Sequence, residues 1–168
     1  MENIILTGYM GSGKTTIGKN LAKRKNYTFV DTDELIEQQQ QRSINEIFAA
    51  DGEQAFRDME TELLRQLIAE RREHMVISTG GGMPLRAENR QLLSHLGKVV
   101  FLKASPRTIY DRIRGDTTRP LLQCANPMGR IEEMIAARTP LYEEGAAIVV
   151  DVNALRQSEA TQEILRRC

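Results

Sequence analysis

The sequence predicts an α/β fold in which a parallel sheet is covered by helices on both faces. Short, continuous apolar runs, each a candidate buried strand, alternate along the chain with longer amphipathic stretches. Strands that are buried on both faces are apolar throughout, so this alternation favours parallel strands joined by crossover helices. Ligands of such sheets bind at the carboxyl ends of the strands, where we expect the functional residues to gather.

Each expected element can be placed from its apolar pattern and its caps. The expected strands are the runs 4–6, 28–30, 75–77, 99–102 and 148–150. The expected helices cover residues 14–25, 32–41, 52–70, 129–142 and 158–167, and two more begin near Ser43 and Ser105. Ser43 and Glu46 have the spacing of a capping box, and Pro106 occupies a position favoured at the start of a helix. The 168 residues fit one domain.

The overall charge excludes some classes of partner. The chain has 23 basic and 23 acidic residues, a balance that predicts no general affinity for nucleic acid or for anionic membranes. An anionic ligand must therefore be held by a local cluster of positive charge. Cys124 and Cys168 lack the spacing of metal ligands, and we expect a reduced, cytoplasmic, monomeric protein without a membrane span.

The clearest motif is the segment Gly8–Thr15, which fits the pattern of a phosphate-binding loop between a strand and a helix. Gly11, Ser12 and Gly13 would present backbone N–H groups to the phosphates of ATP, with the helix dipole adding positive potential. In the same pattern Lys14 neutralises the outer phosphates, Thr15 ligates Mg²⁺, and the adjoining Thr16 extends the ATP site. The alternative is a glycine-rich turn without a ligand.

Two acidic residues, Asp31 and Asp33, follow the second strand. They point in different directions, so Asp31 could bind Mg²⁺, directly or through water, while Asp33 accepts a proton from a substrate hydroxyl. The alternative is a pair of helix-capping acids.

Further along the chain, Arg57 and Glu60 share one face of the long helix, where Glu60 could orient Arg57 toward a ligand carboxylate or form a plain surface ion pair. The triple glycine 80–82 follows a strand and would allow close approach of the backbone to a ligand, or would be a flexible loop.

Arginines mark the later part of the chain. Arg112, Arg114 and Arg119 surround a polar, proline-interrupted segment at about 112–127, which we interpret as a lid that brings Arg119 to the transferring phosphate. An exposed loop with solvated arginines is the alternative. Arg138 could bind a carboxylate through two hydrogen bonds or be a cation at a helix C-terminus.

Taken together, these motifs resemble the shikimate kinase family over nearly the whole chain. The matching segments, in family order, are Gly8–Thr15, Asp31-x-Asp33, Phe56-Arg57, Gly80–Gly82, Arg119–Leu122 and Arg138–Tyr142. The resemblance implies a P-loop fold like that of nucleoside monophosphate kinases, with a five-stranded parallel sheet and substrate-binding helices at about 32–70. It also implies transfer of the γ-phosphoryl group of ATP to the 3-hydroxyl of shikimate, with Mg²⁺.

The resemblance also implies residue roles. Asp33 would hold the substrate hydroxyls, Arg57 and Arg138 would clamp the substrate carboxylate, and the backbone of the triple glycine, above all Gly81, would approach the ring hydroxyls. The apolar side of the pocket would be lined by Ile44, Phe48 and Phe56.

On the ATP side, the resemblance implies that Arg119 reaches the phosphates and that Arg112 lies near the adenine. After the last strand, Arg156 or Gln157 is the candidate for a further adenine contact, in a register that the motifs leave open. Two other functions stay open at this point: a related kinase acting on gluconate or a nucleoside monophosphate, and a nucleotide-binding regulator without catalysis.

Overall fold

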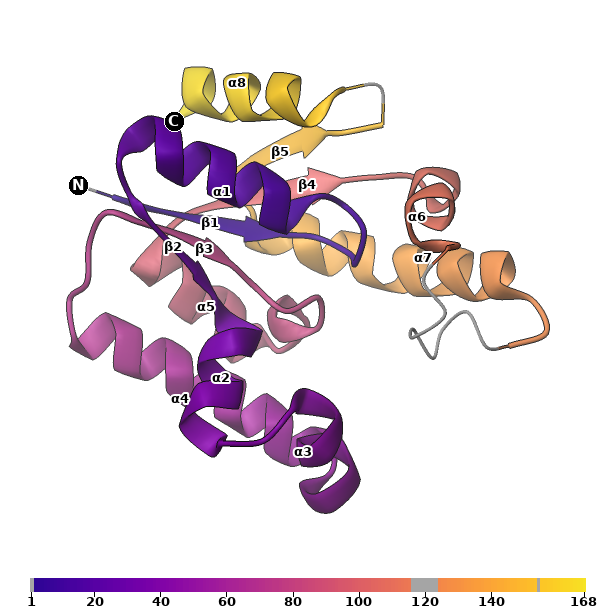
Figure 1. Cartoon of the computed structure of the whole chain (residues 1–168), viewed down its shortest axis with the longest axis horizontal. Coiled ribbons are helices and arrows are strands. Elements are labelled where there is room, and N and C mark those ends of the chain that lie inside the picture. Colours follow the sequence, from indigo (N-terminus) through magenta and orange to yellow (C-terminus); the bar gives the residue numbers. More distant parts are fainter. Residues whose placement is uncertain (1, 116–123, 154) are drawn as a thin grey trace.

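The computed structural model describes residues 2–115, 124–153 and 155–168. Within these residues a five-stranded sheet forms the centre of the molecule (Figure 1). Its strands are β1 (Asn3–Thr7), β2 (Thr28–Asp31), β3 (Met75–Ser78), β4 (Gly97–Lys103) and β5 (Ile148–Asp151). All neighbouring strands are parallel, in the order β2-β3-β1-β4-β5. The predicted parallel sheet is therefore confirmed.

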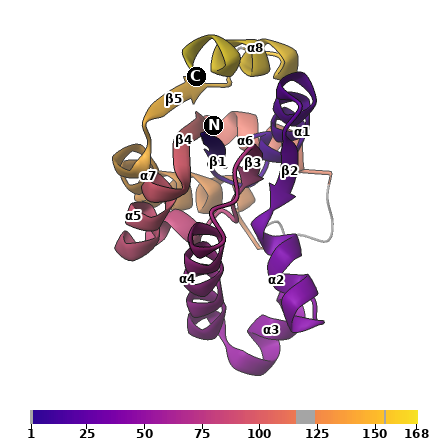
Figure 2. The same cartoon turned by 90° about the vertical axis from the view of Figure 1, so that its left-hand side faces the viewer.

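Helices cover both faces of the sheet. On one face lie α1 (Lys14–Lys25) and α8 (Gln157–Arg167), and on the other lie α4 (Glu53–Ala69) and α5 (Ala87–Leu96), with α7 (Pro127–Gly145) alongside α5 (Figures 1 and 2). Each face has its own apolar core, in which Ile5 and Ile77 pack toward α4, and Leu6 and Val100 pack toward α1. This is the three-layer arrangement that continuous apolar strands predict.

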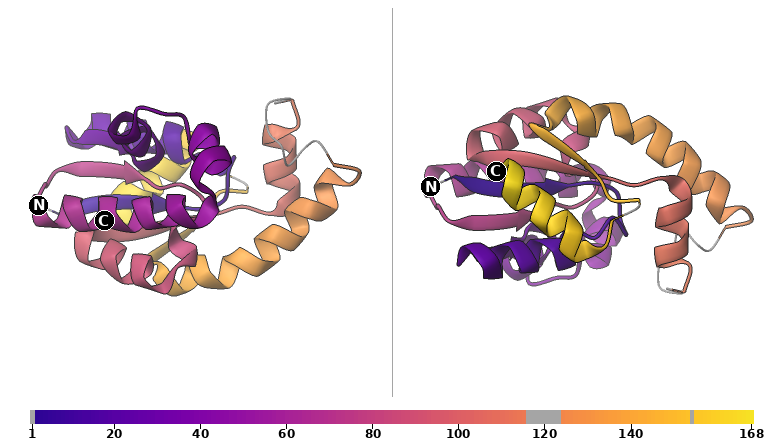
Figure 3. Two further views of the ribbon diagram at one scale, coloured as in Figure 1. Left: turned by 90° about the horizontal axis from the view of Figure 1, so that it is seen from below. Right: turned by 90° about the horizontal axis from the view of Figure 1, so that it is seen from above.

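The remaining elements lie at the end of the sheet where the strands terminate. Helices α2 (Thr32–Gln40) and α3 (Ile44–Asp51) extend from β2 and pack on α4. The turn η1 (Met83–Leu85) follows β3, and α6 (Pro106–Ile113) follows β4. Figure 3 shows α6 and the first half of α7 beyond the carboxyl ends of the strands, far from both termini. The fold therefore surrounds this one edge of the sheet with helices.

Most predicted boundaries agree with the structure within a few residues. Ser43 and Ser105 are side-chain caps as expected, accepting hydrogen bonds from the backbone N–H groups of Glu46 and Thr108. The Ser43 hydroxyl donates to the Glu46 carboxylate, so the return contact of the capping box is made through the side chain of Ser43.

Two features were not predicted. Helix α5 was missed, because it has no side-chain cap and turns the polar Asn89 into the core, where its amide donates to the carbonyl of Met83. Helix α7 starts at Pro127 and continues through Pro140 to Gly145, beyond both expected ends. The expected range 129–142 already contained Pro140, so only the two ends of α7 differ from the prediction.

Gly97 provides a test of this strand packing. A Cβ atom at Gly97 would overlap the backbone carbonyl of Asn3 in the neighbouring strand β1. We expect Gly97→Ala to lower the free energy of unfolding by about 1–3 kcal/mol, the usual cost of overpacking. Gly115→Ala is the matched control, since a Cβ there meets no atom within 4 Å. Urea denaturation of both variants measures the difference, and equal stabilities would contradict this account.

Candidate active site

A cavity of about 360 Å³ opens at the carboxyl ends of β1, β2 and β3. It is lined by the phosphate-binding loop, by the residues that follow β2 and by the residues that follow β3: Met10, Gly11, Gly13, Lys14, Thr15, Thr16, Asp31, Asp33, Ser78, Thr79, Gly80 and Gly81. Three of the motifs found separately in the sequence thus meet in one place.

The phosphate-binding loop has the backbone that its glycines allow. Gly8, Gly11 and Gly13 all have positive φ, and Gly13 is the N-cap of α1 without a side-chain cap. A helix start without a side-chain cap is suited to bind an anion, because its backbone N–H groups and the positive end of the helix dipole lie there. The Lys14 ammonium donates to the carbonyl oxygens of Gly8 at 2.7 Å and Tyr9 at 3.1 Å. It is thereby held over the loop, where outer phosphates of a nucleotide would bind.

The two acidic residues at the end of β2 and the start of α2 have different surroundings. Asp31 is the N-cap of α2, and its Oδ1 atom accepts hydrogen bonds from the N–H groups of Asp33 and Glu34. Any contact of Asp31 with a metal would therefore use its other oxygen. Asp31 is thus a helix cap, as the alternative interpretation held. Asp33 follows two residues later and lines the same cavity.

Asp33 has an unusual environment for an aspartate. The pKa of Asp33 is raised to about 6, chiefly by burial and then by the nearby charge of Asp31, against the opposing effect of Lys14. Its Oδ1 atom is buried and has no hydrogen-bond partner in the described structure. A carboxylate with a pKa near neutral is better suited to accept a proton from a hydroxyl than one with the ordinary value.

Arg57 and Glu60 form a partly buried ion pair, because the Glu60 side chain is 0% exposed and that of Arg57 is 17% exposed. The Arg57 Nη1 atom donates to Glu60 Oε1 at 2.7 Å, and its Nη2 atom donates to Glu53 at 3.3 Å. The plain surface pair is thus ruled out for Glu60. The guanidinium is held in one place by two acidic partners, as the orienting interpretation requires.

The triple glycine makes room for the side chains of the protein itself. A Cβ atom at Gly82 would overlap the guanidinium of Arg57, and one at Gly80 would lie 2.7 Å from Asp33 Oδ1. Gly81 lies beside Arg138, whose Nη1 atom would be 3.5 Å from a Cβ there. The sequence suggests that all three glycines allow a ligand to approach the backbone. In the structure, the missing Cβ atoms of Gly80 and Gly82 make room for Asp33 and Arg57.

Tyr9 and Tyr142, which the sequence analysis did not single out, hold Arg138 at the site. The Arg138 guanidinium lies 5.5 Å from the centre of the Tyr9 ring. The buried Tyr142, one turn later on α7, donates its hydroxyl hydrogen to the carbonyl of Gly81 at 2.6 Å. Tyr9 occupies a variable position of the loop pattern, so the sequence carried no signal for it. Tyr142 did stand in a quoted motif, and its distance to Gly81 arises only on folding.

The residues predicted to line the apolar side of the pocket lie on two neighbouring helices, α3 and α4. The rings of Phe48 on α3 and Phe56 on α4 are 5.0 Å apart, and Ile44 packs against the same core. Phe56 is buried and belongs to this core, while Phe48 and Ile44 are partly exposed. Phe48 and Ile44 therefore offer more surface to a ligand than Phe56 does.

The residues predicted for the adenine side are placed unequally. Arg112 on α6 donates to the carbonyl of Gly11 at 3.0 Å, which brings it to the phosphate-binding loop. Arg156 and Gln157 are exposed at the start of α8, after β5. Arg119 and the central part of the predicted lid, residues 116–123, lie outside the described residues.

Two oxygen-bearing side chains of the cavity are suited to a metal ion. Thr15 and Asp31 both line the cavity next to Lys14 and present oxygen atoms, the ligands that Mg²⁺ prefers. In the part of the chain that the structure describes, no cluster of three or more His, Cys, Asp or Glu side chains could hold a metal. These residues fit an ion that arrives with the phosphates of a nucleotide and keeps most of its water, as Mg²⁺ commonly does.

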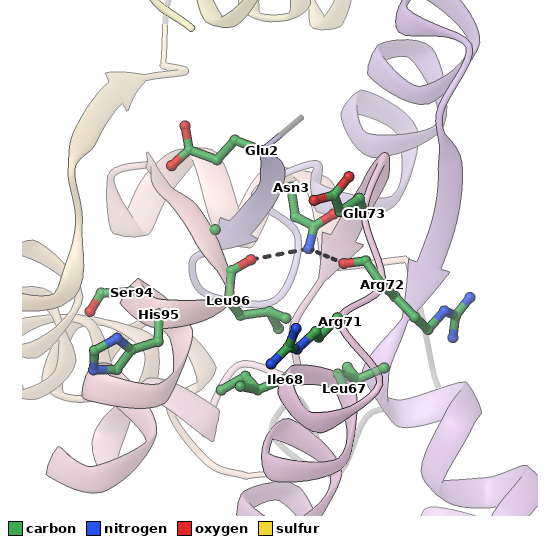
Figure 4. A pocket seen from close by; sticks show the side chains of 11 residues that line it. Glu2, Asn3, Leu67, Ile68, Arg71, Arg72, Glu73, Ser94, His95 and Leu96 are labelled. Atoms are coloured by element: carbon green, nitrogen blue, oxygen red, sulfur yellow. Dashed lines mark hydrogen bonds between the residues drawn. The ribbon is translucent and has the colours of Figure 1, made fainter.

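A second hollow, of about 460 Å³, lies at the opposite edge of the sheet (Figure 4). The Asn3 side chain at its floor donates to the carbonyls of Arg72 and Leu96 and accepts from the N–H of Met75. Asn3 thus ties the start of β1 to the end of α5, to the segment after α4 and to the start of β3. The exposed side chains around it carry both signs of charge, so this hollow is a structural junction at the edge remote from the motifs.

The fold and the cavity define a class of protein. The protein has the features of a P-loop phosphotransferase. These are a phosphate-binding loop after the central strand, a parallel sheet in the order β2-β3-β1-β4-β5, and an acidic residue in the same cavity as the loop. Residues 10–168 match the family model described as shikimate kinase. The chain belongs to the shikimate kinase family.

Curated relatives and solved structures agree with this assignment. The chain is 43% identical to the shikimate kinase of Thermodesulfovibrio yellowstonii, over 99% of this chain and 94% of that protein. It is 44% identical to the shikimate kinase of Neisseria gonorrhoeae, over 98% and 94%. Among solved structures, shikimate kinase from Acinetobacter baumannii in complex with shikimate superposes with a TM-score of 0.90 at 37% identity, covering 99% of this chain and 92% of that one.

Gly82 tests whether the glycines position the arginine. Alanine at Gly82 would displace the Arg57 guanidinium, and the φ of −90° at Gly82 is one that alanine adopts without strain. We expect Gly82→Ala to raise the KM for the acceptor roughly 10- to 100-fold, since small misplacements of a binding group have costs of that order. The KM for ATP and the thermal stability should change little. A loss of ATP affinity with an unchanged acceptor KM would contradict this role.

Proposed function

We propose that the chain transfers the γ-phosphoryl group of ATP to the 3-hydroxyl of shikimate, giving shikimate 3-phosphate and ADP. One observation supports this acceptor most strongly. Beside the phosphate-binding loop, Asp33, Arg138 and Arg57 stand at the successive glycines 80, 81 and 82. Two guanidinium groups suit one carboxylate, and a buried carboxylate suits a hydroxyl, which is the pattern of groups on the shikimate ring.

Each side of the cavity has its own task. On the nucleotide side, Gly11, Ser12, Gly13 and Lys14 hold the phosphates, and Thr16 extends the contact. Lys14 also neutralises the charge that develops in the transition state, because phosphoryl transfer depends on positioning and electrostatic stabilisation more than on covalent help. Arg119 and Arg112 are proposed to complete this side at the phosphates and the adenine, with Arg156 or Gln157 as a further adenine contact.

Magnesium is the proposed cofactor, held by Thr15 and, through water, by Asp31. When bound, the ion neutralises charge on the phosphates of ATP. On the acceptor side, Asp33 receives the proton of the attacking hydroxyl while Arg57 and Arg138 hold the carboxylate. Phe48 and Phe56 close the apolar side of the ring. The backbone of Gly81, fixed by Tyr142, faces the ring hydroxyls.

We further propose a cytoplasmic monomer. Cys124 and Cys168 are exposed and are not joined in a disulfide, which fits a reducing compartment. No helix within the described residues has the length and hydrophobicity that crossing a bilayer requires. Sedimentation of the purified chain measures the oligomeric state directly.

An assay of ADP release with shikimate, gluconate and AMP as acceptors tests the proposed reaction. We expect shikimate to be strongly preferred, since gluconate lacks the rigid ring and AMP needs a base pocket. Preferred turnover of gluconate or AMP would reject shikimate as the acceptor. Tight ATP binding without turnover of any acceptor would instead indicate a nucleotide-binding regulator.

The two arginines should act on the acceptor alone. We expect Arg57→Ala and Arg138→Ala each to weaken shikimate binding by roughly 2–4 kcal/mol, as when one partner of a buried charged contact is removed. Binding of an ATP analogue should be unchanged, and calorimetric titration of both ligands measures the two effects. Arg130→Ala, on the exposed start of α7, is the matched control. Loss of nucleotide affinity with normal shikimate affinity would refute the assignment.

The reaction should slow in acid because of Asp33. This carboxyl must be ionised to accept a proton, and its pKa is raised to about 6, mainly by burial. We therefore expect kcat/KM for shikimate to fall about tenfold per pH unit below that pH. Asp33→Asn should lose roughly 10²- to 10⁴-fold in rate and lack this acidic limb. An Asp33→Asn enzyme with the same acidic limb would show that another group titrates.

A further inference from the structure

Glu60 is a buried carboxyl group with only half of its hydrogen bonding accounted for. Its Oε1 atom accepts from Arg57, whereas its Oε2 atom is buried and has no partner in the described structure. Burying a carboxylate oxygen without a hydrogen-bond donor destabilises the folded state. Anchoring of Arg57 explains Oε1 and leaves Oε2 unexplained.

A second unpartnered carboxylate oxygen lies next to it. Asp33 Oδ1, from α2, and Glu60 Oε2, from α4, would lie 2.7 Å and 3.2 Å from a Cβ atom at Gly80. The two oxygens therefore both border the space beside one glycine. If both groups were ionised, two buried negative charges would share this space without a hydrogen-bond donor. A single proton on one of these oxygens would provide the donor that both lack.

Burial and position indicate which group holds the proton. Glu60 is fully enclosed, while Asp33 lies in the first turn of α2, where the helix dipole favours a negative charge. Burial raises the pKa of Glu60 to about 7, against the opposing effect of Arg57, and the charge of Asp33 raises it too. The charged groups acting on Glu60 are Arg57 of its own helix, Asp33 of α2 and Arg86 from the segment before α5.

We propose that Glu60 is protonated in the resting enzyme and donates a hydrogen bond from Oε2 toward Asp33 Oδ1, while its carbonyl oxygen Oε1 accepts from Arg57. Glu60 is thus a positioning residue that joins the two halves of the acceptor site. This inference rests on the proposed function for its consequence, although the protonation itself is a property of the free protein.

The consequence is a distribution of charge that suits the acceptor. A neutral Glu60 fixes the Arg57 guanidinium without cancelling its charge, so that charge stays available for the substrate carboxylate. The same group holds Asp33 in place as the ionised partner of the hydroxyl. An ionised Glu60 would instead neutralise Arg57 and repel Asp33. Shikimate affinity should therefore be highest while Glu60 keeps its proton.

Infrared difference spectroscopy of the ligand-free protein tests the protonation directly. We expect two carbonyl bands of protonated carboxylic acids, one that is lost near pH 6 and is absent from Asp33→Asn, and one that is lost near pH 7 and is absent from Glu60→Gln. The absence of the second band from the folded wild type, or its persistence in Glu60→Gln, would overturn the proposal. This result does not depend on which acceptor the enzyme uses, so it can be distinguished from a failure of the proposed function.

The pH dependence of shikimate binding tests the consequence. In the wild type we expect affinity to fall above pH 7, by up to about tenfold per pH unit, as Glu60 loses its proton. Glu60→Gln retains an acceptor for Arg57 and a donor for Asp33, so its affinity should match the wild type near pH 6 and stay constant as pH rises. A purely structural ion pair predicts the opposite, namely weakened binding in Glu60→Gln at every pH. That outcome would reject the proposal.

Discussion

The approach of charged side chains to the bare backbone of residues 80–82 is the constraint on which the site depends. Asp33, Arg138 and Arg57 come from three different helices and meet at three consecutive glycines. A side chain at Gly80 or Gly82 would occupy the space that a carboxylate or a guanidinium now fills. The acceptor site is therefore built on missing Cβ atoms, and its geometry follows from where β3 ends.

The fold makes this convergence possible because parallel strands terminate at one edge. The segment after β3 lies next to the phosphate-binding loop, since β1 and β3 are neighbours with Leu6 opposite Ser78. Helix α7 is joined to both segments, through the Tyr9 ring beneath Arg138 and through the Tyr142 hydroxyl on Gly81. The nucleotide and acceptor sides are thus connected by packed aromatic groups.

The site is maintained at the expense of stability. The pKa values of Asp33 and Glu60 are both raised, chiefly by burial, so the folded state holds their protons more tightly than the unfolded chain does. The contribution of such groups to stability is fully present below their unfolded pKa values and is lost as pH rises through about 6 and 7. The favourable packing of the two apolar cores offsets this loss, which is common at functional sites.

The sequence alone determined the layers of the fold and the phosphate-binding loop, because these depend on local pattern. The resemblance of its motifs to a known family placed Asp33, Arg57 and Arg138 in one site. The sequence did not determine helix α5 or the full enclosure of Glu60. Only the tertiary structure decided which groups the glycines admit and which carboxyl oxygens lose contact with water. Those properties arise from side chains that are distant in sequence and become neighbours when β3, α2 and α4 pack together.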